Sequence, residues 1–176
     1  MDLPSTQHSN SYWFPGRALG GISLILAPLL LFTAEILLFQ FHFFFPDQLR
    51  AFDGQPQLVT WSYNLFLTGN ILLWPAVVTV TRLVGQKRPV LATWGGALVM
   101  FGLFARTFHY GINHLSFRLV DILNAEQAIQ IVSKSYGAFH IVSCLSLAIL
   151  IGWIVLAFGC YLSGTLNVAR SVALAM

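Results

Sequence analysis

Seven polar or ionisable residues lie within long apolar stretches of the sequence, where a hydrocarbon solvent would reject them. They are Glu35, Asn64, Arg106, His109, Asn113, Tyr136 and His140. A carboxylate, a guanidinium and two imidazoles can bind anions, transfer protons or ligate metals. Because ionisable groups inside a membrane are costly and usually mark a site, we interpret this set as the lining of a ligand-binding pocket.

The two histidines of this set could hold haem b. We expect His109 and His140 at similar depth on adjacent helices, and two axial imidazoles from facing helices are a usual way to ligate haem, with Arg106 near a propionate. Transmembrane electron transfer normally needs a second centre, and the sequence offers no further histidine pair toward the other side of the membrane.

Two other chemistries would use the same residues. His109, His140 and Glu35 supply two imidazoles and a carboxylate, a set that suits zinc or non-haem iron, and His42 or His114 could add a ligand. No two histidines have the spacing of a zinc-protease motif, so the metal signal is weak. In the third chemistry Arg106 binds the anionic group of a small molecule or lipid, and a histidine responds to protonation.

A structural interpretation stands beside these three. In it Glu35 pairs with Arg106, and the polar layer fixes the register of the helices, as polar residues do between membrane helices. The protein would then be a structural or accessory subunit of a larger membrane complex. The sequence has no glycine-rich phosphate loop, nucleophile elbow or CxxC motif, so ATP-driven transport, serine hydrolysis and thiol oxidation lack support.

The elements that must position these residues follow from composition. The chain is 57% hydrophobic and 9% charged, and its mean hydropathy is +0.75, whereas soluble domains carry about a quarter charged residues. Three stretches lack charge or nearly so, and each exceeds the roughly 20 residues that cross a bilayer. They lie between Arg17 and Asp47, where Glu35 is the exception, between Asp53 and Arg82, and between Lys134 and Arg170. A fourth stretch, from Pro89 to Leu115, is uncharged until Arg106, which neighbouring helices would have to shelter.

We therefore predict an all-α integral membrane protein with a bundle of four transmembrane helices, since helices satisfy their own backbone groups in lipid. The helices are expected at about 20–44, 58–81, 89–115 and 132–161, inside a domain of residues 18–165. Residues 1–17 would form a polar tail and residues 166–176 a C-terminal tail. The segment 115–131 is suited to a short amphipathic helix at the interface, or to an extension of the third span.

The distribution of basic residues predicts the orientation. One side would carry Arg17, Arg82, Lys87, Arg88 and Arg170, and this bias places both termini in the cytoplasm of a bacterial-type cytoplasmic membrane. The pocket would then open to the outer face. The net charge of +3 reports orientation and not nucleic-acid binding, so the expected partners are the lipid bilayer, a second copy of the chain or other membrane subunits.

Two further patterns concern packing. Short similarities at an offset of about 70 residues, such as Ser62-Tyr63 with Ser135-Tyr136, suggest two similar helical hairpins.

Small residues allow close contact between membrane helices. We expect this role for Gly95, Gly96, Gly102, Gly137, Gly152 and Gly159.

Overall fold

The computed structural model describes residues 13–41 and 44–175, and all regular structure in those two ranges is helical, as predicted. Three of the helices, α1, α3 and α4, are long and apolar enough to cross a membrane, and α6 is apolar but shorter. The elements are α1 (Gly16–Leu38), α2 (Asp47–Gly54), α3 (Pro56–Gly85), α4 (Pro89–Ile122), α5 (Ala125–Leu145), α6 (Ala148–Leu162) and α7 (Val168–Ala175).

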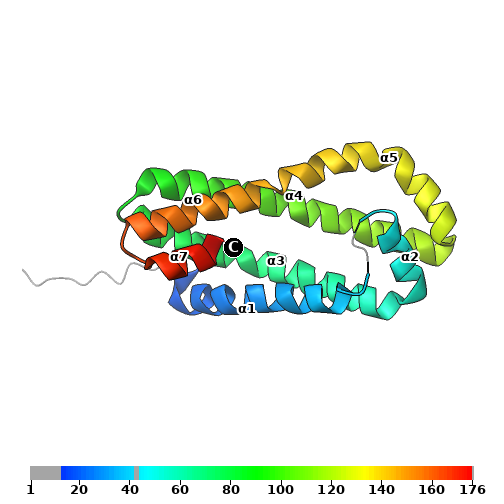
Figure 1. Ribbon diagram of the computed structural model, residues 1–176, viewed down its shortest axis with the longest axis horizontal. Coiled ribbons are helices and arrows are strands. Elements are labelled where there is room, and N and C mark those ends of the chain that lie inside the picture. Colours follow the sequence, from blue (N-terminus) through cyan, green and yellow to red (C-terminus); the bar gives the residue numbers. More distant parts are fainter. Residues whose placement is uncertain (1–12, 42–43, 176) are drawn as a thin grey trace, which may run out of the picture.

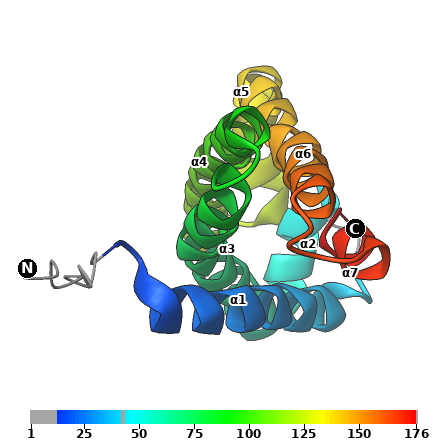
Figure 2. The same cartoon turned by 90° about the vertical axis from the view of Figure 1, so that its left-hand side faces the viewer.

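Four of these helices pack in a row. Helix α1 contacts α3, α3 contacts α4, and α4 contacts α6. The row is curved, so that α1 and α6 face each other across its concave side, with α7 beside α6 (Figures 1 and 2). This order of neighbours decides which polar side chains can meet.

The contact between α1 and α3 is made by small residues. Gly20, Ser23, Ala27 and Ala34 are buried on one face of α1, and the hydroxyl of Ser62 donates a hydrogen bond to the carbonyl oxygen of Ala34 at 2.9 Å. The opposite face of α1 is apolar and exposed. It carries Ile22, Ile25, Leu29, Phe32 and Ile36.

Helices α4 and α6 approach each other at glycines. A methyl group at Gly152 would lie 2.6 Å from the backbone nitrogen of Val99 and 2.8 Å from the carbonyl oxygen of Gly95. One at Gly102 would lie 2.7 Å from the backbone nitrogen of Ile149. The predicted role of these glycines in close packing is confirmed, whereas a methyl group at Gly137 would meet nothing within 4 Å.

The predicted fourth span is not one helix. It is divided into α5 and α6, which meet at a turn at residues 146–147. The first turns of α5 are buried at Ala125, Ala128 and Val132. Beyond them α5 arches away from α4 and exposes Ile141 and Leu145 (Figure 1). A turn within an apolar run, without proline or glycine, leaves no mark in the sequence pattern.

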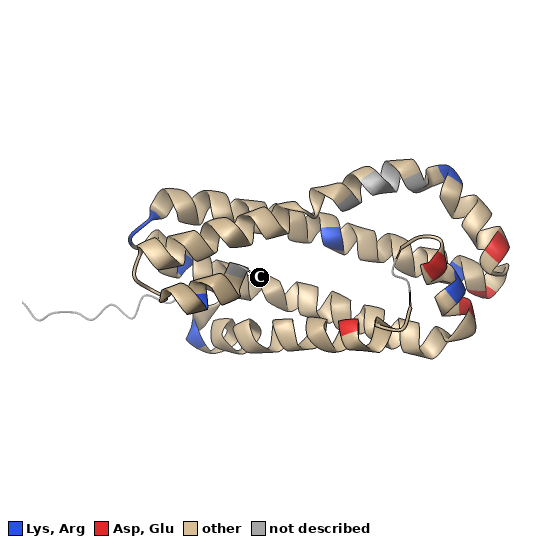
Figure 3. Cartoon of the chain, viewed as in Figure 1, with Lys and Arg blue, Asp and Glu red and all other residues tan. Residues whose placement is uncertain are grey.

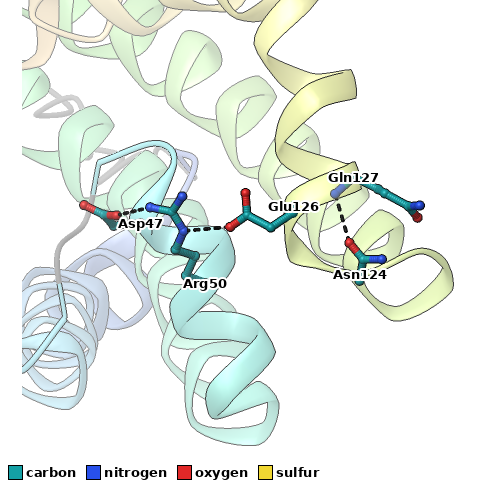
Figure 4. A network of polar contacts seen from close by, with 5 residues as sticks. All are labelled: Asp47, Arg50, Asn124, Glu126 and Gln127. Carbon is teal, nitrogen blue, oxygen red and sulfur yellow. Dashed lines mark hydrogen bonds and ion pairs between the residues drawn. The ribbon is translucent and has the colours of Figure 1, made fainter.

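The predicted amphipathic helix at 115–131 is not a separate element. Helix α4 continues to Ile122, and α5 begins at Ala125. The side-chain oxygen of Asn124 accepts a hydrogen bond from the backbone nitrogen of Gln127 at 2.9 Å (Figure 4). This is an N-cap, which satisfies a backbone donor at the start of α5 and so fixes where the chain turns.

Helix α2 closes one end of the row, and the sequence analysis did not predict it. Leu49 and Phe52 are buried, and the ring of Phe52 stacks on that of Phe117 with centroids 4.7 Å apart. Arg50 bridges to Asp47 and to Glu126 of α5, each at 3.1 Å (Figure 4). The hydrogen bond and charge of Glu126, with a smaller effect of Asp47, raise the pKa of Arg50 above its ordinary value.

The predicted C-terminal tail contains α7. This helix packs on α6, and Leu166 and Leu174 contact the buried cluster around Val99 and Leu156. Residues 1–12 of the predicted N-terminal tail, and His42, lie outside the described residues. Trp13 is described, and its ring lies 4.4 Å from the guanidinium carbon of Arg82.

Most charged side chains gather at the two ends of the row, and the end with α2 carries basic as well as acidic residues (Figure 3). We call the end with α2 the acidic end; Asp47, Asp53, Asp121 and Glu126 belong to it. The opposite, basic end carries Arg17, Arg82, Lys87, Arg88 and Arg170. Lys87 donates to the carbonyl oxygen of Ser163 at 2.8 Å, which ties the turn between α3 and α4 to the end of α6.

Candidate functional site

A cleft of about 640 Å³ lies on the concave side of the row, between α1 and α6. Helices α3 and α4 also line it, and α7 lines part of it near the basic end. Its volume is within the range of about 300–1,000 Å³ that is common for small-molecule sites. We call it the α1–α6 cleft. Most of its wall is apolar, with Leu24, Leu31, Leu73, Leu150, Trp153 and Leu174, and its polar members are Glu35, Asn70, Arg106, Ser146 and Arg170.

Arg106 is held in the cleft by a tyrosine one helical turn further along α4. Its Nε donates to the hydroxyl of Tyr110 at 3.3 Å, and its guanidinium carbon lies 5.8 Å from the centre of the Tyr110 ring. Tyr110 is itself buried and packs against Phe66 and Tyr63. The ring therefore orients the guanidinium, and the two terminal nitrogens of Arg106 have no partner among the described residues.

Glu35 lines the same cleft from α1. Both Glu35 and Arg106 are described, yet no ion pair joins them: the pairs within 4 Å are Arg50 with Asp47 and Glu126, and Arg118 with Asp121. The predicted pairing of Glu35 with Arg106 is therefore not formed. The reason is the order of the helices, because α3 packs between α1 and α4 and keeps their side chains apart.

Glu35 and Arg106 nevertheless lie at the same end of the cleft. Ala34, next to Glu35, accepts a hydrogen bond from Ser62, next to Tyr63. Arg106 donates to Tyr110, whose ring centre lies 6.2 Å from that of Tyr63. Asn70, on the floor of the cleft, is 2% exposed and donates to the hydroxyl of Thr107 at 2.7 Å. Asn70 belongs to the polar layer expected from the sequence, as an amide within a charge-free stretch. Arg170 was expected at the cytoplasmic side and not in the site, and the sequence holds no signal for its place in the cleft.

The two other asparagines of the predicted set lie elsewhere. Asn113 is buried at the acidic end, where its side-chain oxygen accepts a hydrogen bond from Gln48 at 3.2 Å, and Gln48 in turn accepts one from the hydroxyl of Tyr63 at 3.0 Å. Asn64 lies 3.2 Å from the imidazole of His114. These two residues line a second groove of about 420 Å³, beside Trp61.

The haem site and the metal site that the sequence suggested for His109 and His140 remain predictions. His109 is half-buried on α4. The side chains of Tyr136 and His140 lie outside the described part of the structure, although their backbone belongs to α5. Among the residues that are described, no three histidine, cysteine or acidic side chains are grouped so that they could hold a metal ion.

Comparisons of the chain with protein-family models, with curated proteins and with solved structures give no match. The candidate site is therefore defined by its geometry alone. It combines an apolar wall with one acidic side chain, Glu35, and two basic ones, Arg106 and Arg170, and no ion pair joins any of them among the described residues. Such a cleft can bind a molecule with an apolar body and a charged head, with Arg106 as the receptor for an anionic group.

Proposed function

We propose that this chain is a multi-pass protein of a bacterial-type cytoplasmic membrane and that it binds a lipid or lipid-like amphiphile in the α1–α6 cleft. Helices α1, α3 and α4 would each cross the membrane, and α6 with the last turns of α5 would make a fourth crossing. The basic end would face the cytoplasm, following the positive-inside tendency, and Glu35 and Arg106 would lie in the outer half.

The apolar surface supports a location in the membrane. Soluble monomers rarely expose contiguous apolar patches larger than a few hundred Å². Here the outward face of α1 exposes Ile25 at 66% and Phe32 at 65%, and α6 exposes Ile151 and Ile154 at 55% each. In a membrane, lipid acyl chains would cover these faces, so their exposure would carry no penalty in free energy.

One observation carries the binding proposal: Glu35 and Arg106 line the same apolar cleft without pairing. An uncompensated charge in a low-dielectric setting is costly. A bound headgroup would supply the missing partner, and an acyl chain would cover the leucines along the wall. Leu147 and Leu150, which line the cleft on the side of α6, are 57% and 54% exposed, so a lipid could enter sideways from the bilayer.

The proposal is tested by identifying lipids that co-purify with the protein. The protein would be extracted in lipid-preserving polymer discs, and its retained lipids measured by mass spectrometry after exchange into detergent. We expect Arg106→Gln to lose the retained lipid. The control, Arg118→Gln, removes a charge that is exposed and paired with Asp121, and it should retain lipid as the unaltered protein does.

Equal retention in both variants, or no retained amphiphile in the unaltered protein, would overturn this function. The same sample should be examined by visible absorption and metal analysis. A Soret band or a stoichiometric metal that disappears in His109→Ala would favour the haem or metal chemistry instead.

A second candidate function is a structural or accessory subunit of a larger complex. It is favoured by the exposed part of α5, where Ile141 is 68% and Leu145 is 42% exposed and a methyl group at Gly137 would meet nothing. A partner helix could pack there through the small residue. Partner proteins that co-purify with the unaltered chain and are lost in Gly137→Leu, with no retained lipid, would support this alternative.

A further inference from the structure

We infer that the ligand of the α1–α6 cleft is a zwitterionic phospholipid whose headgroup carries a primary ammonium group as well as a phosphate. This inference rests on the proposed function and narrows its ligand. Glu35 and Arg106 are unpaired charges of opposite sign at one level of the cleft, whereas Arg170 lines it from α7. Ala34, beside Glu35, is bonded to Ser62, beside Tyr63, and Arg106 is bonded to Tyr110, the neighbour of Tyr63. A ligand that satisfies both Glu35 and Arg106 must carry both charges within one compact head.

Arg106 is arranged to bind the phosphate. Its Nε is occupied by the hydroxyl of Tyr110, so the terminal nitrogens are left to donate to the cleft. A guanidinium whose plane is fixed offers two parallel N–H groups, which match two oxygens of a phosphate. A purely anionic lipid would satisfy this half of the site as well as a zwitterionic one.

Glu35 would discriminate between a headgroup with a primary ammonium and headgroups without one. Its carboxylate accepts no hydrogen bond from the described residues and forms no ion pair there. A lipid whose only charge is its phosphate would bring a negative charge toward Glu35 with no cation to offset it, which costs binding energy. A primary ammonium has three N–H donors to offer, whereas a quaternary ammonium has none, so a choline headgroup would satisfy the charge of Glu35 without donating hydrogen bonds to it.

The apolar wall fixes the direction of the acyl chain. From Glu35 and Arg106 the wall continues toward the basic end along Leu31, Leu73 and Trp153, and α7 contributes Leu174 there. One acyl chain would follow this wall, and the other would remain in the bilayer at the open side. Arg118 is exposed, paired with Asp121 and outside the cleft, so it provides the control.

The test is lipid competition with three synthetic lipids that share identical oleoyl chains. The full chain is reconstituted in vesicles containing equimolar phosphatidylethanolamine, phosphatidylcholine and phosphatidylglycerol, and lipids retained after detergent extraction are quantified. We expect phosphatidylethanolamine to be enriched about tenfold over each of the others, the effect of one hydrogen bond to a charged group. Arg118→Gln should preserve this enrichment.

The variants separate this inference from the function on which it rests. In Glu35→Gln, phosphatidylethanolamine and phosphatidylglycerol should be retained about equally while lipid is still bound, because a neutral amide neither attracts the ammonium nor repels the phosphate. Retention of phosphatidylglycerol or phosphatidylcholine by the unaltered protein, at the level of phosphatidylethanolamine, would refute the inference but leave lipid binding intact. Retention of none of the three would reject both. The comparison needs only the unaltered protein, so it stands even where a variant does not fold.

Discussion

The acidic end and the α1–α6 cleft contain the same kinds of side chains and use them in opposite ways. At the acidic end the guanidinium of Arg50 has carboxylate partners at 3.1 Å in its own helix and in α5. In the cleft, Arg106 and Glu35 line the same wall and form no pair. The first arrangement holds helices to one another. The second leaves charge available to a ligand, which is why we locate binding in the cleft.

The largest effect on stability should come from the contact that supports the wall of the cleft. Gly152→Ala places a methyl group 2.6 Å from the Val99 nitrogen, and backbone cannot give way as a flexible side chain can. We expect a loss of about 1–3 kcal/mol in the free energy of unfolding, measured by denaturation in mixed micelles. The control, Gly111→Ala, meets nothing within 4 Å and should be neutral. Equal losses in both would show that α4 and α6 are not in close contact.

The polar network of the acidic end should come next. Gln48→Leu removes the side chain that joins the buried Asn113 to Tyr63, which leaves buried polar atoms without a partner. The expected loss is about 1–2 kcal/mol, from the same measurement. Gln57→Leu, at an exposed position, is the control and should change little. If the two substitutions had equal effects, the network would not contribute to the fold.

Removing the exposed ion pairs should lower the free energy of unfolding by less. Arg50→Gln breaks two pairs whose side chains are half exposed or more, and such pairs contribute about 0–1 kcal/mol. The loss should shrink when the salt concentration is raised, because screening weakens exposed pairs. A loss that is independent of salt would indicate that the packing of α2, and not its charge, is affected.

The smallest effect should be the coupling between Glu35 and Arg106. In delipidated protein, Glu35→Gln and Arg106→Gln should combine additively to within about 0.5 kcal/mol, since the two side chains are not in contact. Arg106→Gln alone should cost about as much as one hydrogen bond, the one to Tyr110. A larger coupling energy in a double-mutant cycle would support the helix-register clasp and weaken the case for a ligand.

Much of the packing could be predicted from residue types. The glycines of α4 and α6 were expected to allow close contact, and Gly152 and Gly102 do so against backbone atoms. Helix α2 was missed because its eight residues have no long apolar run, and its two buried side chains, Leu49 and Phe52, become informative only once α4 offers Phe117 as a partner. The turn at residues 146–147 was missed because no helix-breaking residue marks it.

By itself, the sequence determined that the chain is helical, that it has stretches long and apolar enough to cross a membrane, and that most of its charge lies at two ends. It predicted four such spans, and three helices meet that description. These properties follow locally, because hydrocarbon excludes charge and unsatisfied backbone groups. Only the tertiary structure decided which polar residues meet. The periodicity of a helix gives the face on which a side chain lies but not which helix will stand opposite. Here α3 stands between α1 and α4, so Glu35 and Arg106 share a cleft instead of a salt bridge.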